Sequence, residues 1–274
     1  GTFTDLVLLD RAVGTLAVHK LPTTPDDPAR GILDGIDALL KQAGHAAGSI
    51  DLLVHGTTLA TNAILQRRHA KAGMLTTTGF RDVLEIGRQR RPSFYNLDVS
   101  KPVPPVTRDC IFEVPGRLDE TGKEVVPLDR EAARTAVAAL QEAGVEAITI
   151  CFMHAYANPL HEERARDIVQ EMWPEIFVCT SSDVLREFRE FERFASAGIN
   201  ASLLPVIDRY LERFSSGLAA MGLQTAPLVM QSNGGSVSVA TVRKAPINTF
   251  LSGPAGGVVA TANLAAQAGQ PNLI

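Results

Sequence analysis

Cysteine is scarce in this sequence of 274 residues, which contains three: Cys110, Cys151 and Cys179. Because they are odd in number and far apart, they argue against a disulfide framework and against a Cys-x-x-Cys metal site. Cys151 and Cys179 stand in the apolar runs "ITICFMH" and "IFVCTSS", a setting that is typical of buried structural thiols.

Long apolar runs and an excess of positive charge are also missing. No apolar stretch approaches the ~20 residues that span a bilayer, and the first residues are polar turn formers rather than a signal segment. Lys and Arg number 26 against 30 Asp and Glu, a formal net charge of -4, which leaves no basic field for nucleic-acid phosphates. With 45% hydrophobic and 20% charged residues, we expect a cytoplasmic globular protein with no nucleic-acid or membrane partner.

Several well-known motifs of nucleotide-binding proteins and hydrolases are absent from the sequence. The segment "GRLDETGKE" looks like a phosphate-binding loop, but five residues instead of four separate Gly116 from Gly122. In addition, Glu124 stands where that loop needs a hydroxyl for magnesium. G-x-G-x-x-G, H-E-x-x-H and G-x-S-x-G are not found, so the usual dinucleotide, zinc-protease and serine-hydrolase sites are not expected.

Apolar runs of strand length alternate with segments of helical period along the chain, which predicts an α/β fold with a mixed sheet flanked by helices. Pro28 follows the N-cap residue Asp27 and begins a helix that Gly44 ends. A second helix in the segment of residues 58–68 should bury Ala60, Ile64 and Leu65. A long helical stretch after residue 182 contains Pro205, which should kink or divide it.

Five clusters of glycine and hydroxyl residues each follow an expected strand: "GTFTD", "HGTT", "TTTGF", "QSNGG" and "LSGPAGG". Their backbone N–H groups and hydroxyls are suited to surround an anion such as phosphate. Each cluster alone also fits an ordinary turn. Their shared position at strand ends is the stronger indication, because ligands of open α/β sheets bind there.

Together with "HGTTLATNAIL", "CFMHAYANPLHE", "EFREFERFASAGINASLLPV" and "FLSGPAGGVV", these clusters resemble the landmarks of the hydantoinase/oxoprolinase family along essentially the whole chain. The resemblance implies an actin-like ATPase (ribonuclease H-like) fold in two lobes. Residues 1–181 would form the N-terminal hydantoinase/oxoprolinase lobe with the first phosphate loop, and residues 182–274 the start of the hydantoinase A lobe. We expect the chain to begin inside the first loop and to stop before the second, so that the fold is incomplete.

The resemblance implies an ATP-dependent amidohydrolase subunit that phosphorylates and opens a cyclic amide of the hydantoin, oxoproline or lactam type. It also implies ATP and Mg²⁺ as cofactors, with the metal ligands left open, and a second hydantoinase B-type subunit or fused domain as partner. Two alternatives remain: an ATP-dependent carboxylase subunit of the acetone/acetophenone type, and a non-catalytic nucleotide-dependent switch of the actin/chaperone fold.

Site residues follow from matching these motifs to the family. His55 is the expected acid or base near neutral pH, or else a satisfied half-buried histidine. Asp5 is expected to orient the turn or a metal-bound water, or else merely to cap a hairpin. The expected phosphate-binding residues are Gly1, Thr2, Thr4, Thr57, Thr58, Ser252 and Gly253. The expected substrate-binding residues are Asn62, Arg81, Asp82, Ser232, Asn233, Gly234 and Gly235.

Overall fold

A computed structural model describes residues 3–90, 93, 95–96, 98–270 and 272 of the chain. The chain divides into two compact units. The split unit consists of residues 1–62 and 207–274, and the inserted unit consists of residues 63–206. Both contain strands and helices, so the predicted α/β class is confirmed. The predicted division into lobes of residues 1–181 and 182–274 stays a prediction.

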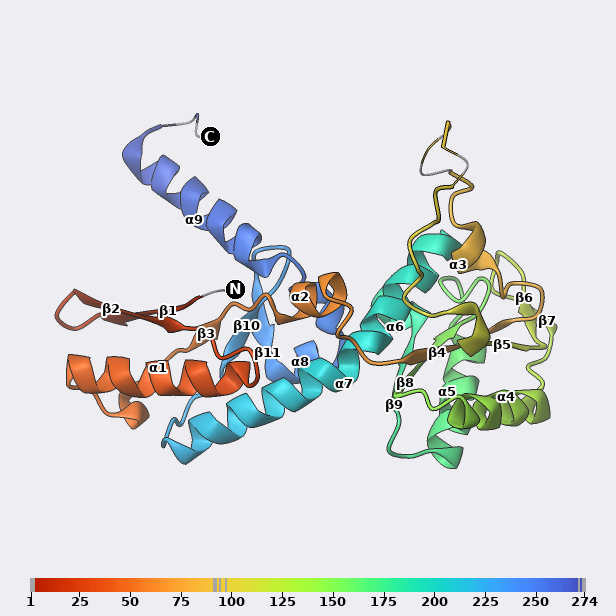
Figure 1. Cartoon of the computed structure of the whole chain (residues 1–274), viewed down its shortest axis with the longest axis horizontal. Coiled ribbons are helices and arrows are strands. Elements are labelled where there is room, and N and C mark those ends of the chain that lie inside the picture. The colour runs from red at the N-terminus through yellow and green to blue at the C-terminus, as the bar shows by residue number, and fades with distance from the viewer. Residues whose placement is uncertain (1–2, 91–92, 94, 97, 271, 273–274) are drawn as a thin grey trace. The chain divides into compact units, whose positions relative to one another are not determined.

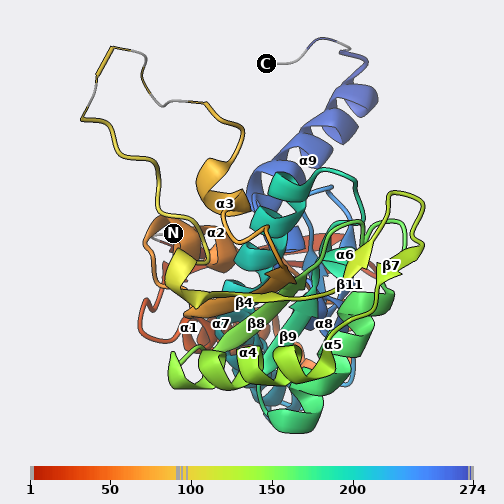
Figure 2. The ribbon, with the colours of Figure 1, turned by 90° about the vertical axis from the view of Figure 1, so that its right-hand side faces the viewer.

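A four-stranded parallel sheet forms the centre of the inserted unit, with the strand order β5-β4-β8-β9. Its members are β4 (Ala72–Thr77), β5 (Ile111–Val114), β8 (Ala147–Cys151) and β9 (Phe177–Thr180). Every residue of β4 and β8 is buried, as expected for a parallel sheet that is covered on both faces. Figure 2 shows α4 (Arg130–Glu142) and α5 (Leu160–Met172) in front of this sheet. The first part of α7 (Glu190–Ala220) also packs on the sheet, since the Cys179 thiol contacts the Ala197 carbonyl.

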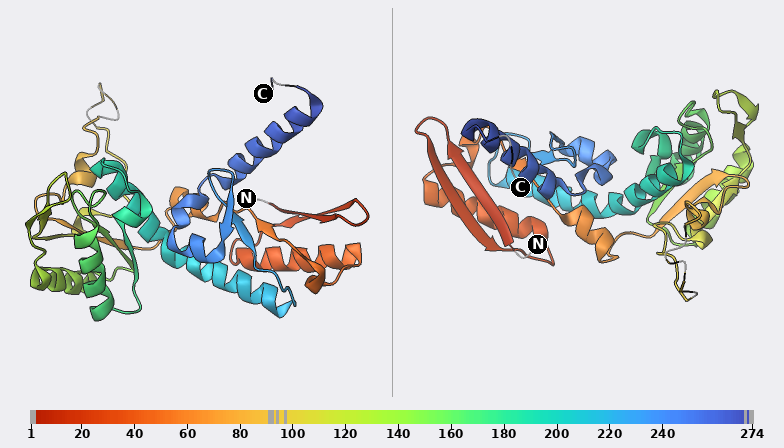
Figure 3. Two further views of the ribbon diagram at one scale, coloured as in Figure 1. Left: turned by 180° about the vertical axis from the view of Figure 1, so that it is seen from behind. Right: turned by 90° about the horizontal axis from the view of Figure 1, so that it is seen from above.

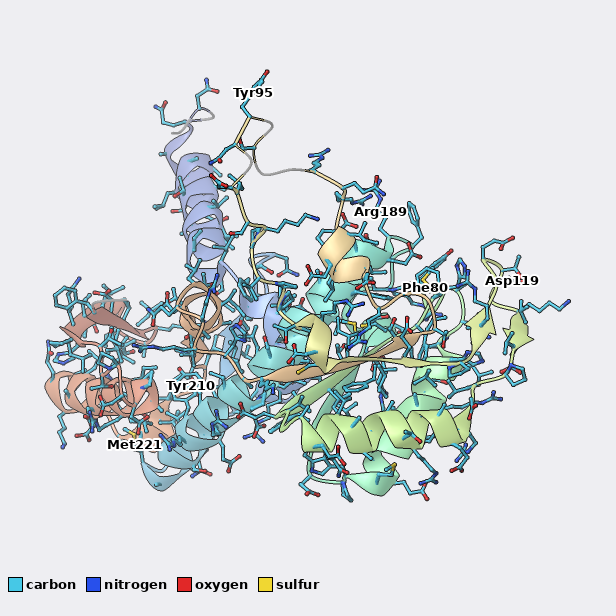
Figure 4. All side chains as sticks on the ribbon, turned by 45° about the vertical axis from the view of Figure 1, so that its right-hand side comes forward. Phe80, Tyr95, Asp119, Arg189, Tyr210 and Met221 are labelled. Atoms are coloured by element: carbon cyan, nitrogen blue, oxygen red, sulfur yellow. The ribbon has the colours of Figure 1, made fainter. Side chains whose placement is uncertain are left out.

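Local sequence signals account for the connections around this sheet. The Asp129 side chain accepts hydrogen bonds from the backbone N–H groups of Glu131 and Ala132 and so caps α4. A hairpin turn occupies the segment "DETG", where Gly122 N–H donates to the Asp119 carbonyl between β6 (Arg117–Leu118) and β7 (Glu124–Val126). Asp119 lies at the tip of this hairpin (Figure 4). Short helices α3 (Val83–Ile86) and α6 (Ser181–Val184) follow β4 and β9.

Gly73 is the second residue of β4, where α4 approaches the sheet closely. A Cβ at this position would lie 2.3 Å from Leu140 Cδ2 and 3.2 Å from Val145 Cγ1. We therefore expect Gly73→Ala to lower the free energy of unfolding by about 1–3 kcal/mol through overpacking. Urea denaturation followed by Trp173 fluorescence measures this loss, since Trp173 belongs to the inserted unit.

A double-mutant cycle tests the cause of that loss. Leu140→Ala alone should cost about 2–5 kcal/mol, because Leu140 is fully buried. The double variant should lose clearly less than the sum of the two single losses, since the shortened side chain makes room for the new methyl group. Strict additivity would contradict the proposed clash.

The split unit contains an antiparallel hairpin of β1 (Phe3–Asp10) and β2 (Thr15–Pro22). Helix α1 (Pro28–Ala43) lies along this hairpin (Figure 1). Gly35 allows the close approach, because a Cβ there would lie 2.6 Å from Leu6 Cδ1. Figure 3 shows the hairpin and α1 from two further sides.

A second sheet in the split unit has the order β11-β10-β3. It consists of β3 (Val54–His55), β10 (Leu228–Met230) and β11 (Ser236–Ser238). β3 and β10 are parallel, whereas β11 is antiparallel to β10, so this sheet is mixed as predicted. Helix α2 (Leu59–Leu65) follows β3, α8 (Val239–Lys244) follows β11, and α9 (Ser252–Ala268) completes the described part of the unit.

Two expectations about helices, the burial of Leu65 and a division at Pro205, are wrong, whereas a kink at Pro205 stays a prediction. Leu65 is 77% exposed, because α2 is one short helix whose buried face is filled by Ala60 and Ala63. Pro205 does not divide the long helix, since α7 continues from Glu190 to Ala220. A proline removes one backbone hydrogen bond, but Leu204 and Ile207 on either side of it are buried, so packing stabilises the helix here.

The three cysteines are free and buried, as predicted for Cys151 and Cys179 from their apolar neighbours. Among the described residues, no helix is both long and apolar enough to cross a membrane.

Candidate functional site

A cavity of about 520 Å³ lies within the split unit, a size that suits a small molecule. One side of it is apolar and comes from α1, with Ile32, Ile36, Leu39 and Leu40. The polar side chains that line it are Thr4, Asp5, Thr23, His55, Thr57, Thr58, Asn62 and Tyr210. The structure therefore brings together residues from β1, from the end of β3 and from α2, which are distant in sequence.

Thr4 and Asp5 both line this cavity, but neighbouring residues of a strand point to opposite faces of the sheet. Thr4 is half-buried and its hydroxyl lies 3.4 Å from that of Thr23. The Asp5 carboxylate is largely exposed and forms an ion pair with Lys20 at 3.1 Å. Thr4 is thus the better placed of the two to contact a ligand inside the cavity.

The segment after β3 supplies two further hydroxyls. The Asn62 side-chain amide donates to the Thr58 hydroxyl at 3.1 Å, so these two side chains lie on the same side of α2. The Ser252 hydroxyl donates to the Thr57 carbonyl at 3.0 Å, and the neighbouring Gly253 lines the cavity. The start of α9 is therefore joined to the Thr57–Thr58 segment.

His55 is held by two aromatic residues of α7. Its Nε2 atom lies 2.6 Å from the Tyr210 hydroxyl, and the Phe214 ring centroid lies 5.0 Å from that of the imidazole. Burial lowers the pKa of His55 to about 4, so the ring is neutral at pH 7 instead of titrating near neutrality as expected. A neutral imidazole accepts a hydrogen bond at one nitrogen and donates at the other.

Sequence reasoning missed Tyr210 and Phe214. The signal was present in "IDRYLERF", where the two aromatic residues are four positions apart and so lie on one face of a helix. A buried tyrosine hydroxyl usually has a hydrogen-bond partner, but nothing in the sequence shows that His55, 155 positions away, is that partner.

Other expected site residues lie away from this cavity. Ser232, Asn233, Gly234 and Gly235 form the turn between β10 and β11, where the Asn233 side chain accepts from Gly235 N–H and the Ser232 hydroxyl donates to the Asn248 carbonyl. This turn belongs to the split unit but does not line the cavity.

Arg81 and Asp82 belong to the inserted unit. Arg81 donates to the Arg108 carbonyl, and Asp82 pairs with the Arg108 guanidinium at 2.6 Å. This pairing holds the pKa of the Asp82 carboxyl below its usual value. Both side chains therefore have protein partners already. Gly1 and Thr2, expected to bind phosphate, lie outside the described residues.

The cavity suits a phosphate group better than a metal ion. Hydroxyls, an amide and glycine backbone line it, and these are donors that phosphate oxygens accept. Among its described lining residues there is no Lys or Arg, and Asp5, its one carboxylate, is paired with Lys20. In the described part of the chain, no group of three or more His, Cys, Asp or Glu residues is placed to hold a metal ion. The described residues therefore do not form a magnesium site by themselves.

Two family models match the sequence. The hydantoinase/oxoprolinase N-terminal region matches residues 1–173, and hydantoinase/oxoprolinase matches residues 193–274. The protein MJ0964 of Methanocaldococcus jannaschii is 38% identical over 96% of this chain and 38% of its own length. The caprolactamase subunit alpha of Pseudomonas jessenii is 34% identical over 100% of this chain and 40% of its own length. The chain thus spans about two fifths of the length of these relatives.

Two solved structures are similar in fold. The crystal structure of the ATP-dependent caprolactamase from Pseudomonas jessenii gives a TM-score of 0.88 at 33% identity. The nucleotide-free structure of acetone carboxylase gives a TM-score of 0.86 at 28% identity. Each match covers 98% of this chain and 40% of the other. On the two family models and these likenesses, the chain belongs to the hydantoinase/oxoprolinase family.

Proposed function

We propose that the protein is an ATP-dependent amidohydrolase subunit that phosphorylates and opens a cyclic amide of the hydantoin, oxoproline or lactam type. The observation that carries this proposal is the likeness to the ATP-dependent caprolactamase over 98% of the chain. The cavity in the split unit supports it, because seven of the expected site residues line that cavity: Thr4, Asp5, His55, Thr57, Thr58, Asn62 and Gly253.

We assign the hydroxyls of Thr4 and Thr58 and the backbone N–H of Thr57 to phosphate oxygens, as neutral donors in a cavity with apolar walls. Bound ATP would supply the phosphoryl group for the amide oxygen, which would open the poorly electrophilic amide carbon to attack and let the phosphorylated oxygen leave as phosphate. Phosphoryl transfer depends mainly on positioning and on donors around the phosphate, and the protein residues supply both. The Ser252 hydroxyl holds the Thr57 segment in place by donating to the Thr57 carbonyl. The Asn62 side-chain amide orients the Thr58 hydroxyl.

The remaining expected residues stay in the proposal. Gly1 and Thr2 would extend the phosphate contacts of Thr4, and Asp5 would orient this turn. The substrate-contact assignments are Arg81, Asp82, Ser232, Asn233, Gly234 and Gly235. Mg²⁺ would accompany ATP, with ligands other than the described residues.

An ATP-dependent carboxylase subunit is the second candidate. The observation that favours it is the likeness to acetone carboxylase, which also covers 98% of the chain. For either activity we propose a partner subunit, since the caprolactamase relative is named as one subunit of its enzyme. We further propose a cytoplasmic location, which the three free cysteines support.

Substrate-dependent ATP turnover by the natural full-length protein, with its partner subunit, tests the proposal. Hydantoin, 5-oxoproline or caprolactam should stimulate ADP release and yield a ring-opened product. Turnover that requires bicarbonate and a ketone would instead establish the carboxylase. ATP turnover that no small substrate changes would contradict both activities.

Thr4→Val should depress ATP turnover in the natural protein by about 10-fold or more, in the range reported for losing one positioned donor. The substitution keeps a β-branched side chain in β1 and removes only the hydroxyl. Thr15→Val is the matched control, because Thr15 is an exposed residue of the same hairpin outside the cavity. Steady-state kinetics of ATP turnover by both variants test this prediction. Near-normal turnover by Thr4→Val would show that Thr4 does not belong to the phosphate site.

A further inference from the structure

Tyr210 lines the cavity and contacts the His55 ring directly. Its hydroxyl lies 2.6 Å from His55 Nε2, and Thr57 forms a second side-chain hydrogen bond with it. The Phe214 ring is parallel to that of Tyr210 at 6.1 Å and also packs against the imidazole. The contacts of α7 thus fix both the position and the plane of the His55 ring.

Both groups of this bond are neutral at pH 7. Burial raises the pKa of the Tyr210 hydroxyl and lowers the pKa of His55 to about 4. Asp5 is the other titratable residue among the described residues that line the cavity, and its carboxylate is paired with Lys20. One proton therefore lies between the tyrosine oxygen and Nε2. If it is bonded to the tyrosine oxygen, His55 is protonated at Nδ1, and if it is bonded to Nε2, Nδ1 is unprotonated.

The surrounding hydrogen bonds decide where that proton lies. The Thr57 hydroxyl oxygen accepts from Leu59 N–H at 3.1 Å, which leaves its own proton free to be donated to the Tyr210 oxygen. The tyrosine oxygen then donates its proton to His55 Nε2. In the opposite arrangement the tyrosine would donate to the Thr57 oxygen, and the Thr57 proton would then need a third partner, which the described residues do not provide. The donors thus form one chain from Leu59 through Thr57 and Tyr210 to His55.

We infer that Tyr210 is a positioning residue that holds His55 as the neutral Nδ1–H tautomer, so that the imidazole donates a hydrogen bond to an oxyanion in the cavity. The Nδ1 atom has no hydrogen-bond partner among the described residues, and His55 lines the cavity. This inference rests on the proposed function for the identity of the oxyanion, a phosphate or a phosphorylated amide oxygen. A neutral imidazole that donates to a developing negative charge is an established way for histidine to act without titrating.

Histidine-ring ¹⁵N NMR of the natural full-length protein tests the tautomer directly. His55→Gln identifies the His55 signals, because these signals are missing from the spectrum of that variant. The wild-type protein should show a protonated Nδ1 and an unprotonated Nε2 near pH 7. Tyr210→Phe keeps the ring but removes the hydroxyl, so the His55 signals should shift toward a mixture of the two tautomers. Tyr156→Phe is the matched control, because it removes another tyrosine hydroxyl, 3.4 Å from His154, and should leave His55 unchanged.

A protonated Nε2 in the wild-type protein would overturn the inference, as would an unchanged His55 spectrum in Tyr210→Phe. Tyr210→Phe should also lower kcat about 10-fold or more with little change in KM, since removing an oxyanion donor outright costs about 10²–10³. The spectra separate this inference from the proposed function. The expected tautomer without any ATP turnover would contradict the function alone, whereas ATP turnover with the opposite tautomer would contradict the inference alone.

Discussion

Glu162→Ala should unfold the inserted unit at clearly lower urea concentration than the wild-type chain requires. Glu162 is fully buried, and its carboxylate accepts hydrogen bonds from Phe152 N–H at 2.9 Å and Ser182 N–H at 2.9 Å. The Ser181 and Ser182 hydroxyls donate to it as well. Without the carboxylate the two backbone N–H groups lose their acceptor inside the protein. At roughly 1–3 kcal/mol for each buried unsatisfied group, the expected loss is about 2–6 kcal/mol.

Trp173 fluorescence during urea denaturation measures this loss, because the single tryptophan of the sequence belongs to the inserted unit. Glu163→Ala is the matched control, since Glu163 is the next residue of α5 and is exposed. It should change the free energy of unfolding by less than about 0.5 kcal/mol. Equal losses in the two variants would show that the four donors do not depend on Glu162.

The loss should also depend on pH. Burial raises the pKa of the Glu162 carboxyl above its usual value. A carboxyl whose pKa is higher in the folded than in the unfolded protein contributes most stability below its unfolded pKa of about 4.3. That contribution falls as the pH rises through the folded pKa. The difference between wild type and Glu162→Ala should therefore be largest in acid and should narrow toward neutral pH.

Arg193→Ala should destabilise the same unit by about 2–5 kcal/mol, as expected for truncating a long buried side chain. Arg193 is fully buried in the first turn of α7. It donates to the Phe152 carbonyl at 3.0 Å and lies over the rings of Tyr156 and Phe194. Its Nε atom is buried without a hydrogen-bond partner. This unpaired group raises the free-energy cost of burying the side chain and reduces the net contribution of Arg193 to the free energy of unfolding.

A second substitution separates packing from hydrogen bonding. Arg193→Met keeps a long side chain between the aromatic rings and should recover part of the stability lost in Arg193→Ala. Arg189→Ala is the control, because Arg189 is exposed four positions earlier (Figure 4) and should have little effect. The same urea titration compares all three variants, and a wild-type midpoint for Arg193→Ala would refute the assigned role.

Local signals made much of this fold predictable. Asp129 caps α4, Gly44 ends α1 and the Asp119–Gly122 turn closes its hairpin, because each depends on residues that are close in sequence. The grouping of Thr4, His55 and Asn62 around one cavity also follows from a local rule, since Thr4 lies near the start of β1, His55 ends β3 and Asn62 lies in the helix that follows β3. Short-range chemistry of this kind is visible in a single sequence.

The unpredicted parts depend on contacts between distant residues. Asp5 is paired with Lys20 across the hairpin, and Asp82 is paired with Arg108, so two expected functional carboxylates already have cationic partners. The neutral state of His55 results from burial against α7 and not from its neighbours in "HGTT". Leu65 is exposed because a short helix ends there. None of these partners is implied by the spacing of residues in the sequence.

All three cysteines of the sequence belong to the inserted unit. Burial raises the pKa of the Cys179 thiol to about 11, and it raises the pKa of Cys151 as well, so few reactive thiolates form while this unit stays folded. Alkylating reagents will therefore modify the chain at the rate at which the inserted unit opens. The rate of alkylation therefore reports the opening of the inserted unit. The split unit contains none of the three cysteines of the sequence and does not contribute to this rate.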